Sequence, residues 1–232
     1  MAMNAFSRML FLVLLAWLFG YGNPLRADNR ETAILENANT ALAKFAAMHF
    51  NKIPMALLQN AQGVAIFPHL VKAAVGVGGR HGRGVLLIRE SDGSWGPPVF
   101  LTLSSAGAGI QFGVERSDLV LIFRTRSDLE RLKEGKLTLG VSDVLAVGPI
   151  GVDGVLATDL CLKTGIISKS RSKGLFAGWS VEGTRLHIDA AANAAYGQYQ
   201  QNYLRNDSST GPAAPPSLQL QMKLAELSVP RP

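Results

Sequence analysis

SKSRSKGLFAGWSVEG, residues 168–183, joins a strictly alternating basic run to an apolar stretch that contains glycine. Alternate side chains of a strand share one face, so Lys169, Arg171 and Lys173 are expected on one face and the serines on the other. Glycine inside such a strand indicates bulges and close backbone approach, as in a strongly curved sheet. Three cations in a row favour anion binding. The competing interpretation is a solvated edge strand, because lysine often protects sheet edges.

The sequence upstream is strand-like almost throughout residues 72–148, and further strands are predicted on both sides of this range. The predicted strands are residues 64–67, 73–79, 85–89, 99–103, 107–114, 119–123, 137–147, 152–162 and 165–170. Residues 76–84, GVGGRHGRG, predict a hairpin with Arg80, His81 and Arg83 at its tip. This tip could bind phosphate through guanidinium and backbone N–H groups, although flexible basic hairpins are usually only solvated. The stretch matches neither the dinucleotide-binding pattern nor the P-loop pattern.

Helices are expected before, between and after the predicted strands. Residues 29–48 place apolar side chains on one stripe of an amphipathic helix, which we expect to dock on the sheet because its polar face has few cations. A short helix follows from Pro54, a capping box at Ser127 predicts another, and Asp189 is the expected N-cap of the last. The predicted fold is α+β: a curved, largely antiparallel sheet or partial barrel, with a long N-terminal helix and a C-terminal helix packed on it.

The ends of the chain have different characters. Residues 1–27 resemble a secretory signal peptide, with Arg8 before an apolar run and Ala27 at a cleavage position; an uncleaved anchor is the alternative. Residues 28–205 are predicted to form one domain. Residues 206–232 are rich in Pro and Ser and are expected to be a disordered tail, in which residues 218–228 could become helical on contact with a partner.

The composition indicates a globular protein with a basic balance. The chain has 232 residues, 47% hydrophobic and 17% charged, with a formal net charge of +6. This balance favours anionic partners but does not choose between phospholipid and nucleic acid. The single cysteine, Cys161, excludes an internal disulfide and a thiolate metal cluster.

No pattern of residues predicts an enzyme. The four histidines have no metal-site spacing, no nucleophile elbow occurs, and no acidic pair stands out, so no cofactor or metal is expected. No nucleic-acid-binding motif is present either. A hydrolase nevertheless remains one hypothesis, and a cluster of His81 or His187 with an acid and a serine would favour it.

Several blocks of the sequence together resemble the SYLF-domain family, whose lipid-binding domain is found in bacterial envelope proteins and in eukaryotic phosphoinositide- and actin-associated proteins. The resemblance is carried by residues 63–87, 92–98, 109–123, 147–149 and 170–183, in the family's order. It covers about residues 32 to 197. Two positions depart from the family: Lys169 stands where an aromatic residue is usual, and Val152 where a basic residue is common.

The resemblance implies a non-enzymatic protein that binds lipid. We expect an exported protein of the periplasm or cell envelope that binds anionic phospholipid through the basic hairpin and the basic strand. An envelope protein-interaction or scaffold module is the alternative. The resemblance and the residue pattern together give these candidate lipid-binding residues, the last two as apolar contacts at a membrane interface: Lys72, Arg80, Arg83, Lys169, Arg171, Lys173, Phe176 and Trp179.

Overall fold

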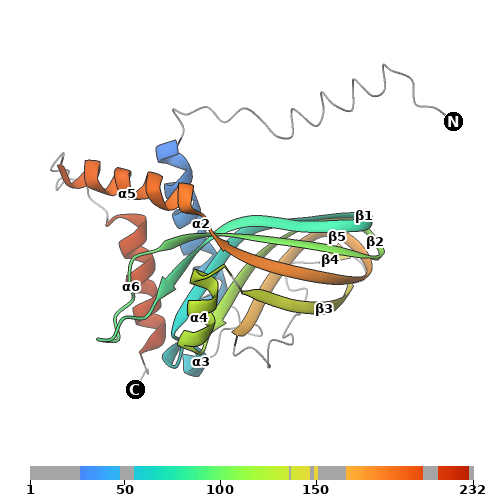
Figure 1. The fold of residues 1–232 in the computed structure, drawn as a ribbon, viewed down its shortest axis with the longest axis horizontal. Helices are drawn as coiled ribbons and strands as arrows, with labels where there is room; N and C mark the ends of the chain where they lie inside the picture. The colour runs from blue at the N-terminus through green and yellow to red at the C-terminus, as the bar shows by residue number, and fades with distance from the viewer. Residues whose placement is uncertain are drawn as a thin grey trace, which may run out of the picture.

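The fold is α+β, as predicted (Figure 1). The computed structural model describes residues 27–47, 55–135, 137–146, 149–150, 166–205 and 214–229. The signal-peptide prediction, apart from Ala27, and Cys161 lie outside the described residues. The elements in chain order are α2 (Ala27–Ala47), α3 (Met55–Gln59), β1 (Gly63–Ile88), β2 (Val99–Phe123), α4 (Arg126–Lys133), β3 (Thr138–Ala146), β4 (Pro149–Ile150), β5 (Ile166–Ile188), α5 (Ala190–Arg205) and α6 (Pro216–Ser228).

The sheet is antiparallel and built on very long strands. Its order is β1-β2-β5-β3, and β4 also pairs with β5. β1, β2 and β5 have 26, 25 and 23 residues, whereas ordinary strands have about 3–10. Segments that the sequence predicts as separate strands, such as 107–114 and 119–123, are therefore parts of one continuous strand.

The predicted hairpin at residues 76–84 is wrong, because β1 runs through this stretch and pairs with β2 on both sides of it. Instead of reversing, both strands bend: Val75 pairs with Phe112 but Val77 pairs with Ala108, and Gly76 between them has φ +74°. That φ is readily available to glycine, which explains how the strand bends here without ending. The glycines that predicted a turn therefore produce the curvature of the sheet.

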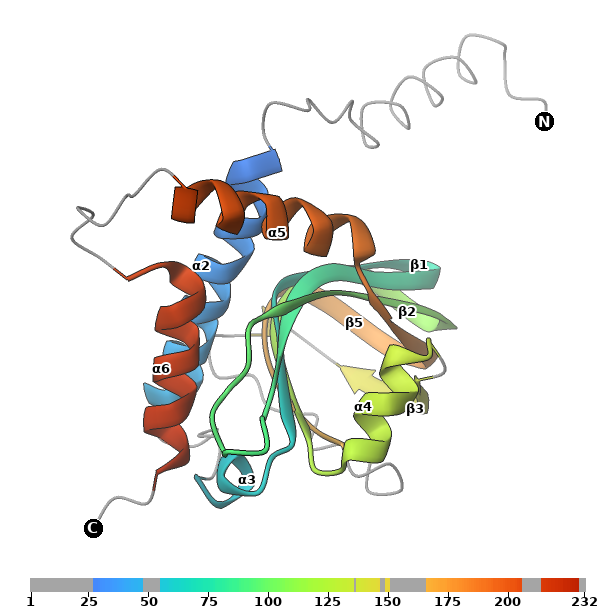
Figure 2. The same cartoon turned by 60° about the vertical axis from the view of Figure 1, so that its left-hand side comes forward.

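The bend brings the two halves of β1 against each other, forming what we call the seam. A Cβ added at Gly84 would lie 2.3 Å from the carbonyl oxygen of Ile66, and one at Gly82 would lie 2.5 Å from Cδ2 of Leu70. Only glycine permits this approach. The sheet is consequently curled, as Figure 2 shows.

Each face of the curled sheet carries its own hydrophobic core. On the convex face, α2, α5 and α6 cover the core that includes Phe45, Ile66 and Val120; on the concave face, α4 contributes Leu129 to the core that includes Phe67 (Figure 2). The core residues of β2 alternate: the even-numbered ones belong to the convex core and the odd-numbered ones to the concave core. The convex set is Phe100, Val120 and Ile122; the concave set is Leu101, Leu103, Leu119, Leu121 and Phe123. Since β2 and β5 pair without a register shift, this alternation assigns a face to every position of both strands.

The helix caps agree with the sequence in part. Asp189 is the N-cap of α5, as predicted, and its Oδ1 accepts a hydrogen bond of 3.0 Å from the backbone N–H of Ala192. The N-cap of α4 lies two residues before the predicted Ser127: it is Thr125, whose side chain accepts a hydrogen bond from the N–H of Asp128. The carboxylate of Asp128 accepts in return from the Thr125 hydroxyl at 2.6 Å, so Thr125 and Asp128 form the reciprocal pair that was predicted to begin at Ser127.

The tail does not remain disordered throughout, because residues 216–228 form α6. Leu220 and Leu224, one turn apart, are fully buried in the convex core. Asn39 Nδ2 on α2 donates to the carbonyl of Pro216 at 2.8 Å, and Gln221 Nε2 donates to the carbonyl of Trp95 at 2.9 Å. Residues 218–228 were expected to become helical on contact with a partner, and here they pack against α2 of the same chain.

Candidate functional site

The predicted site residues of β1 do not form one exposed cluster. Lys72 is only 1% exposed and pairs in register with Glu115, which is also buried at an odd, concave-face position of β2. Arg80 pairs with Ser105, another concave-face position, and its Nε is buried. These two cations therefore face the interior of the curl, because the strand that carries them bends where a hairpin tip was expected.

Arg83 lies on the convex side, where it joins elements of the fold. Its guanidinium lies 3.2 Å from Oδ2 of Asp189 at the start of α5 and 3.9 Å from Oε1 of Glu31 on α2. Both carboxylates are largely buried and Arg83 is partly exposed. This arrangement gives Arg83 a structural role as an ion-paired link between strand and helices.

The basic run of β5 alternates as predicted. Lys169, Arg171 and Lys173 pair with the convex-face positions Val120, Asp118 and Arg116 of β2. Lys173 is exposed and Arg171 is half-buried. The side chain of Lys169 lies outside the described part of the chain.

The side chains of Phe176 and Trp179 also lie outside the described part. Their backbone register separates them, however. Phe176 pairs with Gly113, a concave-face position, and Trp179 pairs with Ile110, a convex-face position. Of these two apolar candidates, only Trp179 thus shares a face of β5 with the basic run.

The most exposed apolar surface of the sheet lies at the bend and was not predicted from the sequence. We call it the rim: Val71 (40% exposed), Val75 (77%), Val77 (73%), Phe112 (70%) and Val114 (59%). No described helix covers this end of β1, β2 and β5 (Figure 1). Large apolar side chains gathered in one exposed place mark interaction sites more often than singly scattered ones do.

Cations lie beside the rim on the convex face of the sheet. Arg116 is exposed two residues from Val114 and pairs in register with Lys173. Arg116 makes no ion pair within the described residues. The next acid on this face of β2 is Asp118, which is held by Lys44 at 3.9 Å and by the N–H of His69. Arg116 thus continues the basic run of β5 on the neighbouring strand β2, next to the apolar rim.

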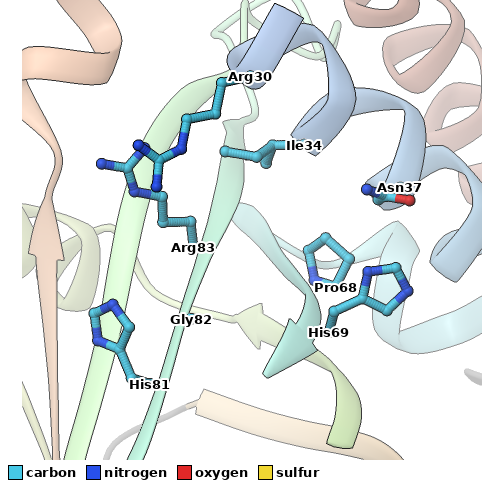
Figure 3. A pocket seen from close by; sticks show the side chains of 8 residues that line it. All are labelled: Arg30, Ile34, Asn37, Pro68, His69, His81, Gly82 and Arg83. Carbon is cyan, nitrogen blue, oxygen red and sulfur yellow. The ribbon is translucent and has the colours of Figure 1, made fainter. Parts of the chain in front are cut away.

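A second feature is a groove of about 280 Å³ between α2 and the seam (Figure 3). Its polar lining residues come from α2 and from both halves of β1: Arg30, Asn37, His69, His81 and Arg83. His81 Nδ1 lies 3.1 Å from the hydroxyl of Ser104. No carboxylate contacts His81 among the described residues, so the acid, histidine and serine cluster that a hydrolase needs is not assembled there.

The clearly shifted pKa values belong to groups away from the rim and the groove. Burial lowers the pKa of Arg89, whose guanidinium lies 4.5 Å from the ring of Trp95. Burial also raises the pKa of Tyr196, which packs edge-on against Phe100. Within the described residues, no group of three or more His, Cys, Asp or Glu side chains could hold a metal ion, and no helix is long and apolar enough to cross a membrane.

The comparisons with known proteins agree on one family. The family model Ysc84, described as Las17-binding protein actin regulator, matches residues 104–221. LAS seventeen-binding protein 3 of Saccharomyces cerevisiae is 34% identical over 167 residues, which are 71% of this chain and 36% of that protein. Human SH3 domain-containing YSC84-like protein 1 is 37% identical over 137 residues, 58% of this chain and 39% of that protein.

The chain therefore spans a little over a third of the length of these relatives. No solved structure matches it. The match extends through β2, α4 and β5 into α6, so it includes Phe112, Arg116 and the basic run.

Proposed function

Since the chain belongs to the SYLF (Ysc84) domain family, we propose that it is a non-enzymatic protein that binds anionic phospholipid membranes with the rim and the cations beside it. As expected from the sequence, we place it in the periplasm or cell envelope after export. The observation that carries the proposal is the position of the exposed apolar rim beside Arg116, Arg171 and Lys173 on one face of the sheet.

The two parts of this surface would act on different parts of a bilayer. Burying a large apolar side chain is worth about 1.5–3 kcal/mol, so insertion of the rim into the headgroup region stabilises the bound state. Each cation near an anionic surface contributes about 1 kcal/mol, and salt screens this contribution. Lys72 and Arg80 take no part, because they are at concave-face positions, and Arg83 takes none, because it is ion-paired.

The proposal can be tested by co-sedimentation of the purified protein with neutral and anionic vesicles across a salt series. Phe112→Ser is expected to weaken binding to anionic vesicles about tenfold or more, from the lost apolar transfer. Met222→Ser is the matched control, because Met222 is 60% exposed on α6, away from the rim.

The cations are tested in the same assay. Replacing both Arg116 and Lys173 by Gln is expected to weaken binding about tenfold or more and to flatten the salt dependence. Lys133→Gln on α4 removes an exposed cation elsewhere and should leave binding unchanged. Equal binding by the rim variants and their controls would reject the rim as the membrane contact.

The alternative function is a protein-interaction module, and α6 supplies an observation for it. Leu218 and Met222 are exposed on the side of this helix away from its buried leucines, and Val229, directly after the helix, is exposed as well. The relatives' names include a binding partner, Las17, which fits such a role. Retained partner capture by Phe112→Ser, with loss of capture by Met222→Ser, would favour this function over membrane binding.

A further inference from the structure

The groove between α2 and the seam has a lining without acids. Its polar lining groups are the guanidinium groups of Arg30 and Arg83, the amide of Asn37 and the imidazoles of His69 and His81, with Ile34 and Pro68 as apolar walls (Figure 3). Each of these polar groups can donate hydrogen bonds. Glu31 and Asp189 contact Arg83 but do not line the groove. The lining therefore suits an anion.

Two of the donors are fixed in place before any ligand arrives. Arg83 is held by Asp189 at 3.2 Å, and His81 is held by the hydroxyl of Ser104 at 3.1 Å. Arg30 is exposed and makes no ion pair among the described residues, so its full charge is available to a ligand. Preorganised donors lose less entropy on binding, and guanidinium groups match phosphate oxygens in geometry.

The backbone at His69 is unusual and brings another donor to the groove. The pairing of β1 with β2 shifts between Phe67 and Leu70, and His69 within this bulge has φ +57°. Bulges frequently re-aim a side chain next to a functional site, and positive φ in residues other than glycine concentrates at such sites. Here the bulge sets the imidazole beside α2, while the N–H of His69 is held by Asp118 at 3.0 Å.

We propose that this groove binds a phosphate monoester, as a second site distinct from the rim. The ligand is either a soluble phosphate compound or the headgroup of a lipid such as phosphatidic acid. The groove and the rim are close along β1: His69 is two residues from Val71, which corresponds to about 7 Å of strand. A lipid whose phosphate occupies the groove could therefore have its acyl chains near the rim, and this lipid source rests on the proposed function.

Isothermal titration calorimetry of the purified protein with glycerol 3-phosphate and with inorganic phosphate tests the site without a membrane. We expect binding of glycerol 3-phosphate, weakened at least about fivefold by Arg30→Gln through the loss of one charge-assisted contact. His81→Gln is expected to weaken it as well. Arg124→Gln is the matched control, because Arg124 is exposed at the end of β2 and does not line the groove.

The two sources are distinguished with vesicles of equal surface charge that contain phosphatidic acid or phosphatidylglycerol. If the protein prefers vesicles with phosphatidic acid and Arg30→Gln abolishes this preference, the ligand is the lipid headgroup. If glycerol 3-phosphate binds in the calorimeter but the protein shows no such preference, the ligand is a soluble phosphate compound. The absence of any titration, or equal weakening by Arg30→Gln and Arg124→Gln, overturns the proposal. Because Phe112→Ser should leave the titration unchanged, failure of the rim and failure of the groove are separate results.

Discussion

Replacing Gly84 by Ala tests the seam, on which the curl of the sheet depends. The added methyl would lie 2.3 Å from the carbonyl oxygen of Ile66 and 2.6 Å from the ring of Phe67. Since carbon and oxygen ordinarily approach to about 3.3 Å, the two halves of β1 would have to separate by about 1 Å. Overpacking of this kind costs about 1–3 kcal/mol. We expect about 3 kcal/mol, because the Ile66 oxygen belongs to the backbone and cannot rotate away.

Urea unfolding followed by circular dichroism measures this change. With a slope of about 2 kcal/mol per molar urea, the midpoint of Gly84→Ala should fall by about 1.5 M. Gly183→Ala in β5 is the matched control: nothing lies within 4 Å of its added Cβ, and its stability should stay within about 1 kcal/mol of the parent. Equal midpoints for the two variants would refute the close contact between the halves of β1.

Three further predictions concern stability. Leu224→Ala on α6 should lower the free energy of unfolding by about 2–5 kcal/mol, because Leu224 is fully buried, whereas Met222→Ala should change it little; denaturant titration checks both. Arg83→Ala should cost about 1–2 kcal/mol by leaving its carboxylate partners unpaired, and a double-mutant cycle with Asp189→Asn should show coupling of the two side chains. Burial raises the pKa of Tyr196, so the protein should lose stability as pH rises above about 10, where the unfolded phenol ionises first; Tyr196→Phe should reduce this loss in thermal melts.

Local patterns in the sequence predicted much of the fold. The stripe of residues 29–48 predicts α2 and the side it buries, because helical periodicity depends only on near neighbours. Asp189 is identified as an N-cap for the same reason. The alternation of Lys169, Arg171 and Lys173 follows from the period of a strand, and the register agrees with it.

The errors come from interactions between distant residues. Glycine permits both a hairpin and a bend, and only pairing with β2 decides that β1 continues through residues 76–84. Lys72 has the sequence context of a surface cation, but the curl of the sheet buries it. The composition of residues 206–232 indicated disorder, although Leu220 and Leu224 fit the core beside α2.

The rim is the part of the site that sequence alone could not reveal. Val75 and Phe112 occur in alternating apolar patterns that equally predict a buried strand face. Whether such a face is covered depends on how far the helices reach along the sheet. The combination of Phe112, Val114 and Arg116 at alternate positions was the available signal, because a cation in line with apolar residues fits a solvent boundary.

The contact between α2 and α6 has a consequence for the order in which the protein folds. The convex core includes Leu35 near one end of the chain and Leu224 near the other, and the Asn39–Pro216 hydrogen bond spans 177 residues. Closing so long a loop is entropically costly, and folds dominated by such distant contacts form slowly. During synthesis, α2 therefore emerges long before the helix that covers it. Until α6 follows, the part of the α2 surface that α6 covers is available to chaperones or to aggregation.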